Sequence, residues 1–239
     1  MKKFKLSIVI PILNEASNLN KLVEKIKTNL NNKIIYEIIF VDDNSNDNTK
    51  EIIKKIIKKN KNIKYILRTK DRDLSKSCIL GFSKAKSNVI AVMDGDLQHD
   101  PKDLIKMYLL QTKKDLDFVI GVRSFKKGFL KGLGLMRYLA SVSLILFFFI
   151  LVGKKTLDPM SGFFIFKRKI YMKNKKKLFK KGYKILADLV YLPGKNFKTT
   201  DYEINFKIRN HGKSKMNSMV LFNIIKFIIF NFIRKFLKF

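Results

Sequence analysis

Short apolar segments rich in β-branched residues alternate with amphipathic segments of helical period through the first half of the chain. The strand-like segments are residues 7–12, 36–43, 62–68, 88–96 and 117–123, and the helix-like segments are residues 14–30, 49–60, 76–86 and 101–111. Strands that alternate with helices of this length are typical of a mostly parallel α/β sheet that is covered by helices on both faces. The sequence therefore predicts an α/β fold.

Polar side chains follow several of these strands at the point where each strand ends. The clusters are Asn14-Glu15, Asp42-Asp43, Asp94-Gly95-Asp96 and Arg123. In open parallel sheets, ligands bind beyond the carboxyl ends of the strands, and these ends lie on one edge. We expect the four clusters to meet there and to form a binding site.

The second half of the chain carries most of the positive charge. Residues 1–120 have a net charge of +9, and residues 121–239 have a net charge of +23. A basic half points to an anionic partner such as a phosphorylated substrate, an acidic lipid surface or a nucleic acid. Codon bias toward A and T is the alternative explanation for the excess of lysine. A single cysteine, Cys78, excludes an intramolecular disulfide and fits a reducing, cytosol-facing location.

Two apolar segments stand apart from the α/β pattern. Residues 138–153 carry no charge over 16 residues, which is short of the ~20 needed to span a bilayer. Residues 218–239 are rich in Phe, Ile and Leu but contain lysines and arginines, which favours a helix lying in the membrane interface. A membrane span and a core helix are the alternatives, and Lys226 weighs against the span. We expect a catalytic domain over residues 1–216 and a membrane-associating helix over residues 217–239.

The acidic strand ends suggest metal chemistry. Asp94, Asp96 and Gln98 offer hard oxygen ligands that suit Mg²⁺ or Mn²⁺. An acidic loop that only caps the helix starting near Pro101 is the alternative. Residues 41–49, VDDNSNDNT, could likewise be a loop of Asx turns that leads into a helix. His99 could act as a base, although a loop residue near a helix start is the simpler interpretation. Two histidines and one cysteine exclude a Cys/His zinc site.

Five segments in order resemble one known family. They are IPILNE (10–15), VDDNSNDNT (41–49), RDLSKSCILGF (72–82), MDGDLQHDP (93–101) and DPMSGFF (158–164), with weaker support from GYKIL (182–186) and RNHGKSKM (209–216). Together they resemble the inverting family-two glycosyltransferases, and within them the dolichol-phosphate (polyprenol-phosphate) mannosyltransferases. The resemblance implies a nucleotide-sugar-binding fold of GT-A type. It also implies transfer of a hexose, mannose from GDP-mannose in the first instance, to a polyprenyl phosphate.

The resemblance also implies roles for particular residues. The nucleotide-sugar site would comprise Pro11, Leu13, Glu15, Val41, Asp42, Asp43, Asp94, Gly95, Asp96, Gln98, Ile120, Arg123, Lys184 and Arg209. Within that set, Asp94, Asp96 and Arg123 would be catalytic, and Asp94, Asp96 and Gln98 would hold Mg²⁺ or Mn²⁺. The acceptor phosphate would meet Arg137, Ser141 and Lys215. Two positions depart from the family: Leu13 stands where an aromatic residue is usual, and Asp73 where glycine is common.

The implied chemistry agrees with the composition. Departure of a nucleoside diphosphate builds negative charge, which a divalent metal and basic side chains would stabilise. A lipid monophosphate is largely ionised at neutral pH, because its second pKa is ~6, so it needs no strong general base. The implied partners are a nucleotide-sugar donor, a polyprenyl-phosphate acceptor and the cytoplasmic face of a membrane. A UDP-sugar donor, a glycan acceptor and a nucleic-acid-binding module are the alternatives.

Overall fold

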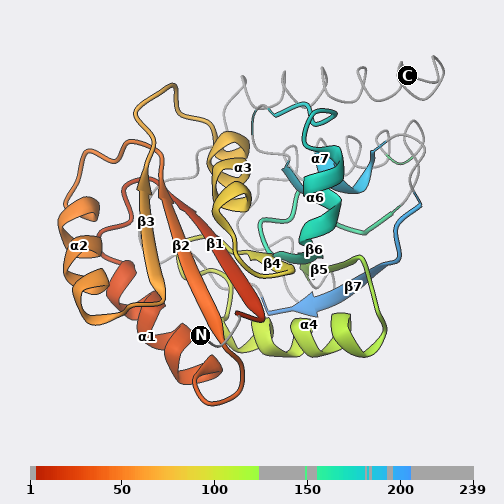
Figure 1. The fold of residues 1–239 in the computed structure, drawn as a ribbon, viewed down its shortest axis with the longest axis horizontal. Coiled ribbons are helices and arrows are strands. Elements are labelled where there is room, and N and C mark those ends of the chain that lie inside the picture. Colours follow the sequence, from red (N-terminus) through yellow and green to blue (C-terminus); the bar gives the residue numbers. More distant parts are fainter. Residues whose placement is uncertain are drawn as a thin grey trace, which may run out of the picture.

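The computed structural model describes residues 4–123, 149, 155–180, 182, 185–192 and 196–205. These residues form a seven-stranded sheet with helices packed on both faces (Figure 1). The strand order is β3-β2-β1-β4-β6-β5-β7. The predicted α/β architecture with two covered faces is confirmed.

The elements follow the predicted segments closely. The strands are β1 Leu6–Ile12, β2 Tyr36–Asp42, β3 Ile63–Leu67, β4 Val89–Val92, β5 Phe118–Arg123, β6 Phe164–Lys167 and β7 Thr199–Ile204. The helices are α1 Leu19–Leu30, α2 Thr49–Lys59, α3 Leu74–Lys84, α4 Lys102–Lys113, α6 Arg168–Asn174 and α7 Ile185–Val190. Each strand and helix predicted in the first half is present in the structure.

One strand of this sheet runs against the others. Strands β1 and β2, β2 and β3, β1 and β4, and β5 and β7 pair in parallel, whereas β6 pairs antiparallel with both β4 and β5. Because β6 is inserted between them, β4 and β5 point in the same direction. The carboxyl ends of β1, β2, β4 and β5 therefore lie at one edge of the sheet, where the segment that enters β6 also arrives.

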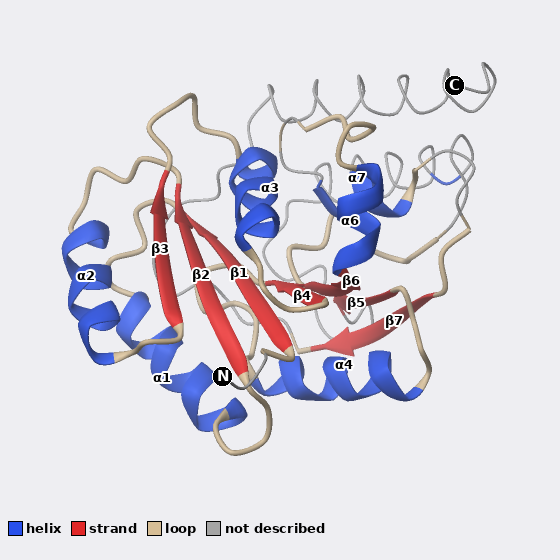
Figure 2. Cartoon of the chain, viewed as in Figure 1, coloured by secondary structure: helices blue, strands red, loops and turns tan. Residues whose placement is uncertain are grey.

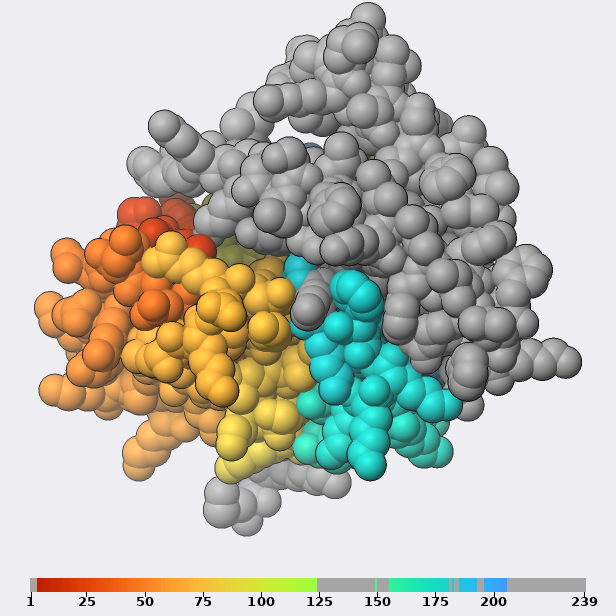
Figure 3. Space-filling view, turned by 90° about the horizontal axis from the view of Figure 1, so that it is seen from above, coloured from red at the N-terminus to blue at the C-terminus, as the bar shows by residue number. Residues whose placement is uncertain are grey.

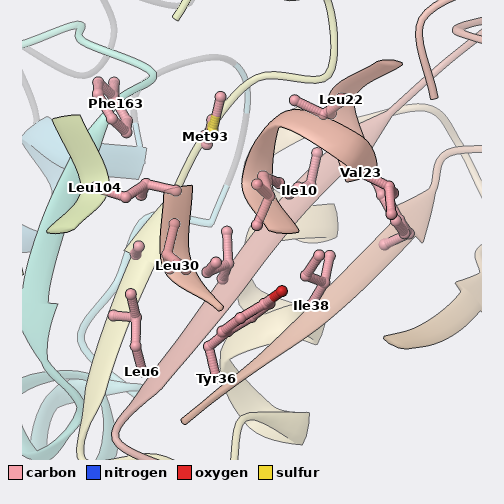
Figure 4. Close-up of a cluster of buried hydrophobic side chains, with 14 of the residues drawn as sticks. Leu6, Ile10, Leu22, Val23, Leu30, Tyr36, Ile38, Met93, Leu104 and Phe163 are labelled. Carbon is pink, nitrogen blue, oxygen red and sulfur yellow. The ribbon is translucent and has the colours of Figure 1, made fainter. Parts of the chain in front are cut away.

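Helices lie on both faces of the sheet (Figure 2). A hydrophobic core on each face holds them to the strands. Neighbouring side chains of β1 point to opposite faces. Val9 belongs to the core that includes residues of α3, α6 and α7, and Ile8 and Ile10 belong to the core that includes residues of α1, α2 and α4. Figure 4 shows the second core, with Leu22 and Leu30 of α1 and Leu104 of α4 facing the strands. Polar residues such as Asp43 and Asp94 follow the strands at the carboxyl edge of the sheet.

Helix α1 starts later than the periodicity predicts. The sequence pattern suggests a helix from residue 14, but the helix begins at Leu19. Asn14 takes a left-handed backbone conformation with φ 57°, which asparagine tolerates better than most residues. Residues 14–18 therefore form a loop at the carboxyl end of β1, where they are available to a site.

Several predictions concern segments outside the described residues. They include nearly all of the apolar segment 138–153, the helix predicted over residues 217–239 and the domain boundary at residue 216. Within the described ranges, the structure contains no helix that is both long enough and apolar enough to span a membrane.

Candidate active site

The loops that follow β1 and β2 are joined to each other by hydrogen bonds. The backbone N–H of Asn14 donates to Ser45 Oγ at 2.9 Å, and Asn14 Oδ1 accepts from the N–H of Asn46 at 2.9 Å. The N–H of Glu15 donates to Thr49 Oγ1 at 3.1 Å. These contacts hold the two predicted nucleotide-binding segments as one rigid border of the sheet edge.

The Asp42 carboxylate stabilises the loop after β2 by accepting hydrogen bonds from Ser45 and Tyr65. The Asp42 side chain is fully buried. Asp42 Oδ1 accepts hydrogen bonds from the Ser45 N–H at 2.8 Å and the Ser45 hydroxyl at 2.6 Å, and Oδ2 accepts from the Tyr65 hydroxyl at 2.8 Å. These contacts include the turn that the alternative interpretation of residues 41–49 predicts, and the place of Asp42 beside the nucleotide stays a prediction.

Asp43 forms a buried ion pair with Arg68, whose role the sequence analysis missed. The Arg68 guanidinium donates to Asp43 Oδ1, and Asp43 Oδ2 accepts from the Asp73 N–H at 2.6 Å. The side chains of Arg68 and Asp43 are only 8% and 9% exposed. Burial raises the pKa of Asp43, and the positive charge of Arg68 opposes that rise. Arg68 lies just after a strand, and that position is the signal that could have found it.

The acidic motif occupies a tight turn directly after β4. Leu97 has a φ of 64°, and Asp96 Oδ1 accepts from the Gln98 N–H at 3.1 Å. Asp96 is buried, whereas 36% of the Asp94 side chain is exposed. A Cβ at Gly95 would lie 2.8 Å from Ile12 Cγ2 and 3.6 Å from Glu15 Cγ, so the motif packs directly against the loop after β1. The turn thus brings two predicted segments into contact.

Gly162, from the segment before β6, lies against the Asp94 carboxylate. A Cβ at this position would come within 2.8 Å of Asp94 Oδ1 and closer still to Oδ2. Only glycine therefore allows the DPMSGFF segment to approach Asp94 this closely. The contact explains in physical terms why a small residue stands at this point of the motif.

His99 is buried within the site rather than lying in an exposed loop. Its ring stacks on Phe163, with centroids 5.0 Å apart and planes inclined by 19°, and Nδ1 lies 3.8 Å from Asp94 Oδ2. Burial lowers the pKa of His99 to about 4, since the nearby Asp96 only partly offsets the effects of burial and of Arg123. The imidazole is therefore neutral at pH 7, and it packs beside the acidic motif.

Arg123 reaches the DPMSGFF segment from the end of β5. Its Nε donates to Asp158 Oδ2 at 3.1 Å, and Nη2 lies 3.1 Å from the same oxygen. The Ser161 hydroxyl donates to the Gly121 carbonyl at 2.6 Å and ties the same segment to β5. Because 39% of the Arg123 side chain is exposed, its guanidinium remains accessible to an anionic ligand.

A cavity of about 180 Å³ lies beside Asp94 between the sheet edge, α3 and α7. Its lining combines the polar side chains of Asp94 and Ser161 and the backbone of Gly162 with largely apolar side chains, namely Pro11, Leu74, Cys78, Val92, Met160 and Ile185. The cavity therefore joins β1, β4, α3, α7 and the segment before β6 around one partly exposed carboxylate.

The structure brings most of the predicted site residues in its described part to this edge. Glu15, Asp43, Gly95, Asp96, Gln98 and Arg123 lie there, Pro11 and Asp94 line the cavity, and Leu13 is half-buried in the loop after β1. Val41 and Ile120 are fully buried in the core, so their side chains can only support the site. Lys184, Arg209, Arg137, Ser141 and Lys215 lie outside the described residues.

The acidic motif offers a suitable donor set for a divalent cation only if a ligand completes it. Within the described ranges, no group of three or more His, Cys, Asp and Glu side chains is arranged to hold a metal. Mg²⁺ is commonly held by one or two carboxylates together with substrate phosphates and waters. Partly exposed Asp94, together with Asp96 and the half-buried Gln98, fits that pattern.

Replacement of Gly162 by Ala tests the contact with Asp94. The added methyl group must displace the carboxylate, and a shift of about 1 Å in a reacting group costs on the order of 100-fold in rate. We expect turnover to fall by about that factor, with little change in the melting temperature. Gly121→Ala is the steric control, because its Cβ would crowd Phe163 and Ile204 instead. Equal losses of turnover in both variants would contradict this role of Gly162.

The fold is a mostly parallel α/β sheet with an acidic site at the carboxyl ends of its strands. Residues 7–174 match the family described as Glycosyl transferase family 2, and the chain belongs to this family. The predicted membership of the family-two glycosyltransferases is thereby confirmed.

Two related proteins are named dolichol-phosphate mannosyltransferase. The chain is 34% identical over 231 residues to a dolichol-phosphate mannosyltransferase of Pyrococcus furiosus, covering 94% of this chain but 62% of that protein. It therefore spans less than two thirds of this relative. A dolichol-phosphate mannosyltransferase of Saccharomyces cerevisiae is 27% identical over 230 residues, with 90% of this chain and 82% of that protein covered.

A solved structure shares the fold. It is glucosyl-3-phosphoglycerate synthase of Mycobacterium tuberculosis, crystallised with Mn²⁺, UDP-glucose and phosphoglyceric acid. The two chains superpose with a TM-score of 0.66 at 14% identity, and the match covers 97% of this chain and 79% of that chain. At this identity the similarity establishes the common architecture.

Proposed function

We propose that the chain transfers a hexose from a nucleotide sugar to a polyprenyl phosphate with inversion, and that the donor is GDP-mannose. The observation that carries the proposal is the convergence of Asp94, Asp96 and Arg123 at one sheet edge beside a cavity. Relatives named dolichol-phosphate mannosyltransferase, similar over nine tenths of the chain, support this acceptor.

The residues of the edge suit the departure of a nucleoside diphosphate. Asp94, Asp96 and Gln98 would hold Mg²⁺ or Mn²⁺, which supplies positive charge to the diphosphate. Arg123 adds a guanidinium that is partly exposed and held in place by Asp158, so it can meet a phosphate without losing its orientation. The rigid border formed by the loops after β1 and β2 would bind the nucleoside, with Glu15 and Asp43 as its polar groups.

The acidic residues of the second half favour a phosphate acceptor over a glycan hydroxyl, which would need a carboxylate base. Asp188 accepts from the N–H groups of Phe179 and Lys180 at 2.8 and 3.0 Å, and Asp201 accepts from the Thr156 hydroxyl and the Leu157 N–H. Asp158 is paired with Arg123. These three carboxylates serve structural contacts, and the fourth of the second half, Glu203, is exposed on β7. An ionised lipid phosphate attacks without a base.

The remaining predicted roles belong to the same proposal. Lys184 and Arg209 would bind the donor, and Arg137, Ser141 and Lys215 would bind the acceptor phosphate. The helix of residues 217–239 would lie at the cytoplasmic face of a membrane, where the polyprenyl headgroup is presented. The net charge of +23 over residues 121–239 supports attraction to an anionic surface.

A donor screen tests the proposal. The full chain is mixed with polyprenyl phosphate in detergent, Mg²⁺ or Mn²⁺, and GDP-mannose, UDP-glucose, UDP-galactose or UDP-N-acetylglucosamine in separate reactions. We expect mass spectrometry to detect a hexosyl-phospho-lipid from GDP-mannose, and we expect EDTA to abolish it. Product from a UDP-sugar alone would support the proposed transfer to a polyprenyl phosphate and would contradict GDP-mannose as the donor. No lipid product from any donor would refute the proposed acceptor.

A further inference from the structure

Gly182 is clamped to the N-terminus of α3 by three hydrogen bonds. Its N–H donates to Asp73 Oδ2 at 2.8 Å, and its carbonyl accepts from Ser75 Oγ at 2.7 Å and from the Ser75 N–H at 2.9 Å. Gly182 is buried and has a φ of 82°, in the left-handed region that favours glycine. The N–H and the carbonyl of Gly182 are thus both hydrogen-bonded to the first residues of α3 and its N-cap, more than 100 positions earlier in the chain.

Asp73 also contacts the predicted nucleotide site. Its N–H donates to Asp43 Oδ2 at 2.6 Å, and its carbonyl accepts from Arg68 Nη1 at 3.2 Å. Its Oδ1 accepts from the Lys76 N–H at 2.9 Å and so caps α3. One residue therefore joins the buried Asp43–Arg68 pair to the segment at Gly182.

Gly182 precedes α7, whose first residue, Ile185, lines the cavity. Asp188 of α7 accepts the N–H groups of Phe179 and Lys180. Ile185 of α7 and Leu74 of α3 both line the cavity beside Asp94. Seen from above, the surface of α3 lies directly against that of residues 160–190 (Figure 3). The hydrogen bonds of Gly182 to Asp73 and Ser75 therefore attach a residue close to α7 to the N-terminus of α3.

We propose that Asp73 is a positioning residue that couples nucleotide binding at Asp43 to the position of Gly182. This inference rests on the proposed function, because it takes Asp43 as part of the donor site. A nucleotide that orders the Asp43–Arg68 pair also orders Asp73, and Asp73 in turn orders Gly182. Because coupling between two sites is reciprocal, the position of Gly182 also affects nucleotide affinity.

The Asp73→Asn variant tests the hydrogen bond to the Gly182 N–H separately from the other contacts of Asp73. Asparagine caps helices as well as aspartate, and the backbone contacts with Asp43 and Arg68 need no side chain. Its single carbonyl oxygen can serve Lys76 but leaves an amide group facing the Gly182 N–H. Asp71→Asn is the matched control, because it removes the same charge from an exposed side chain in the same loop. Ser75→Ala is a milder second variant, and Ser83→Ala on the exposed face of α3 is its control.

Hydrogen exchange of residues 179–182 is measured with and without GDP and UDP in Mg²⁺, together with steady-state kinetics. We expect Asp73→Asn to speed this exchange about tenfold, to abolish its slowing by nucleotide, and to raise the donor KM about tenfold with kcat within twofold. We expect Ser75→Ala to give smaller changes in the same direction, and both controls to match the wild-type chain.

Wild-type exchange at residues 179–182 that does not respond to a nucleotide shown to bind would overturn the coupling and leave the proposed function standing. Asp73→Asn with unchanged exchange and an unchanged donor KM would overturn the positioning role. Failure of both nucleotides to bind the wild-type chain would instead count against the proposed function. The ligand-free exchange of Asp73→Asn would still decide whether Asp73 holds Gly182.

Discussion

Replacement of Asp96 by Asn is expected to lower kcat/KM for sugar transfer by about 1000-fold. Asp96 is 3% exposed and belongs to the donor set proposed for the divalent cation. Loss of one carboxylate removes several kcal/mol of stabilisation of the departing diphosphate, and about 4 kcal/mol corresponds to a factor of 1000. Asparagine keeps the shape of the side chain and an oxygen for the Gln98 N–H, so the turn should survive.

Steady-state kinetics over a range of Mg²⁺ and Mn²⁺ concentrations measures this effect. Asp100→Asn is the matched control, because Asp100 lies in the same loop but accepts the Lys102 N–H at the start of α4. We expect the control to keep its activity within a few-fold and Asp96→Asn to need a higher metal concentration. An Asp96→Asn variant with wild-type kcat/KM would exclude Asp96 from the catalytic set.

Replacement of Arg68 by Met is expected to lower the free energy of unfolding by about 3–5 kcal/mol at pH 7.5. The substitution leaves the Asp43 carboxylate buried without its cation, which is the costly way to break a buried ion pair. Urea denaturation followed by circular dichroism measures the difference. Arg72→Met is the control: Arg72 is exposed and donates one hydrogen bond to the Asn44 carbonyl, so we expect a loss within about 1 kcal/mol.

The cost of Arg68→Met should depend on pH. Burial already raises the pKa of Asp43, and loss of the Arg68 charge raises it further. A carboxyl group with a raised pKa favours the folded state at low pH and loses that contribution as pH rises through its folded pKa. The difference between wild type and variant should therefore shrink from pH 7.5 toward pH 5. The double variant Arg68→Met/Asp43→Asn should recover much of the loss at pH 7.5, and a double variant no more stable than Arg68→Met would contradict the explanation.

Residues that act through local sequence were predictable. The β-branched runs and the helical periods identify all five strands and four helices of the first half, because burial on both faces requires continuous apolar strands. The acidic turn after β4 was predictable for a related reason, since polar residues directly after a buried strand must lie at the sheet edge. The proposed roles of Asp94, Asp96 and Gln98 remain predictions that the experiments above test.

Residues that act through distant contacts were not predictable. Arg68 looks like any basic residue after a strand until its contact with Asp43 is seen. His99 lies in the loop before α4, as expected, but its burial and its stacking on Phe163 are seen only in the structure. Gly162 matters only because β6 enters the sheet beside Asp94. Asp73, a departure from the family pattern, is explained by its contacts with Lys76 and Gly182.

The sequence by itself determined the α/β class, the family and the edge of the sheet that carries the site, because periodicity and short motifs are local properties of the chain. The tertiary structure decided which side chains meet. It inserted β6 antiparallel between β4 and β5, buried His99 beside the acidic motif and joined Gly182 to α3. These outcomes depend on the pairing of segments that lie far apart in sequence, and no local pattern specifies such pairing.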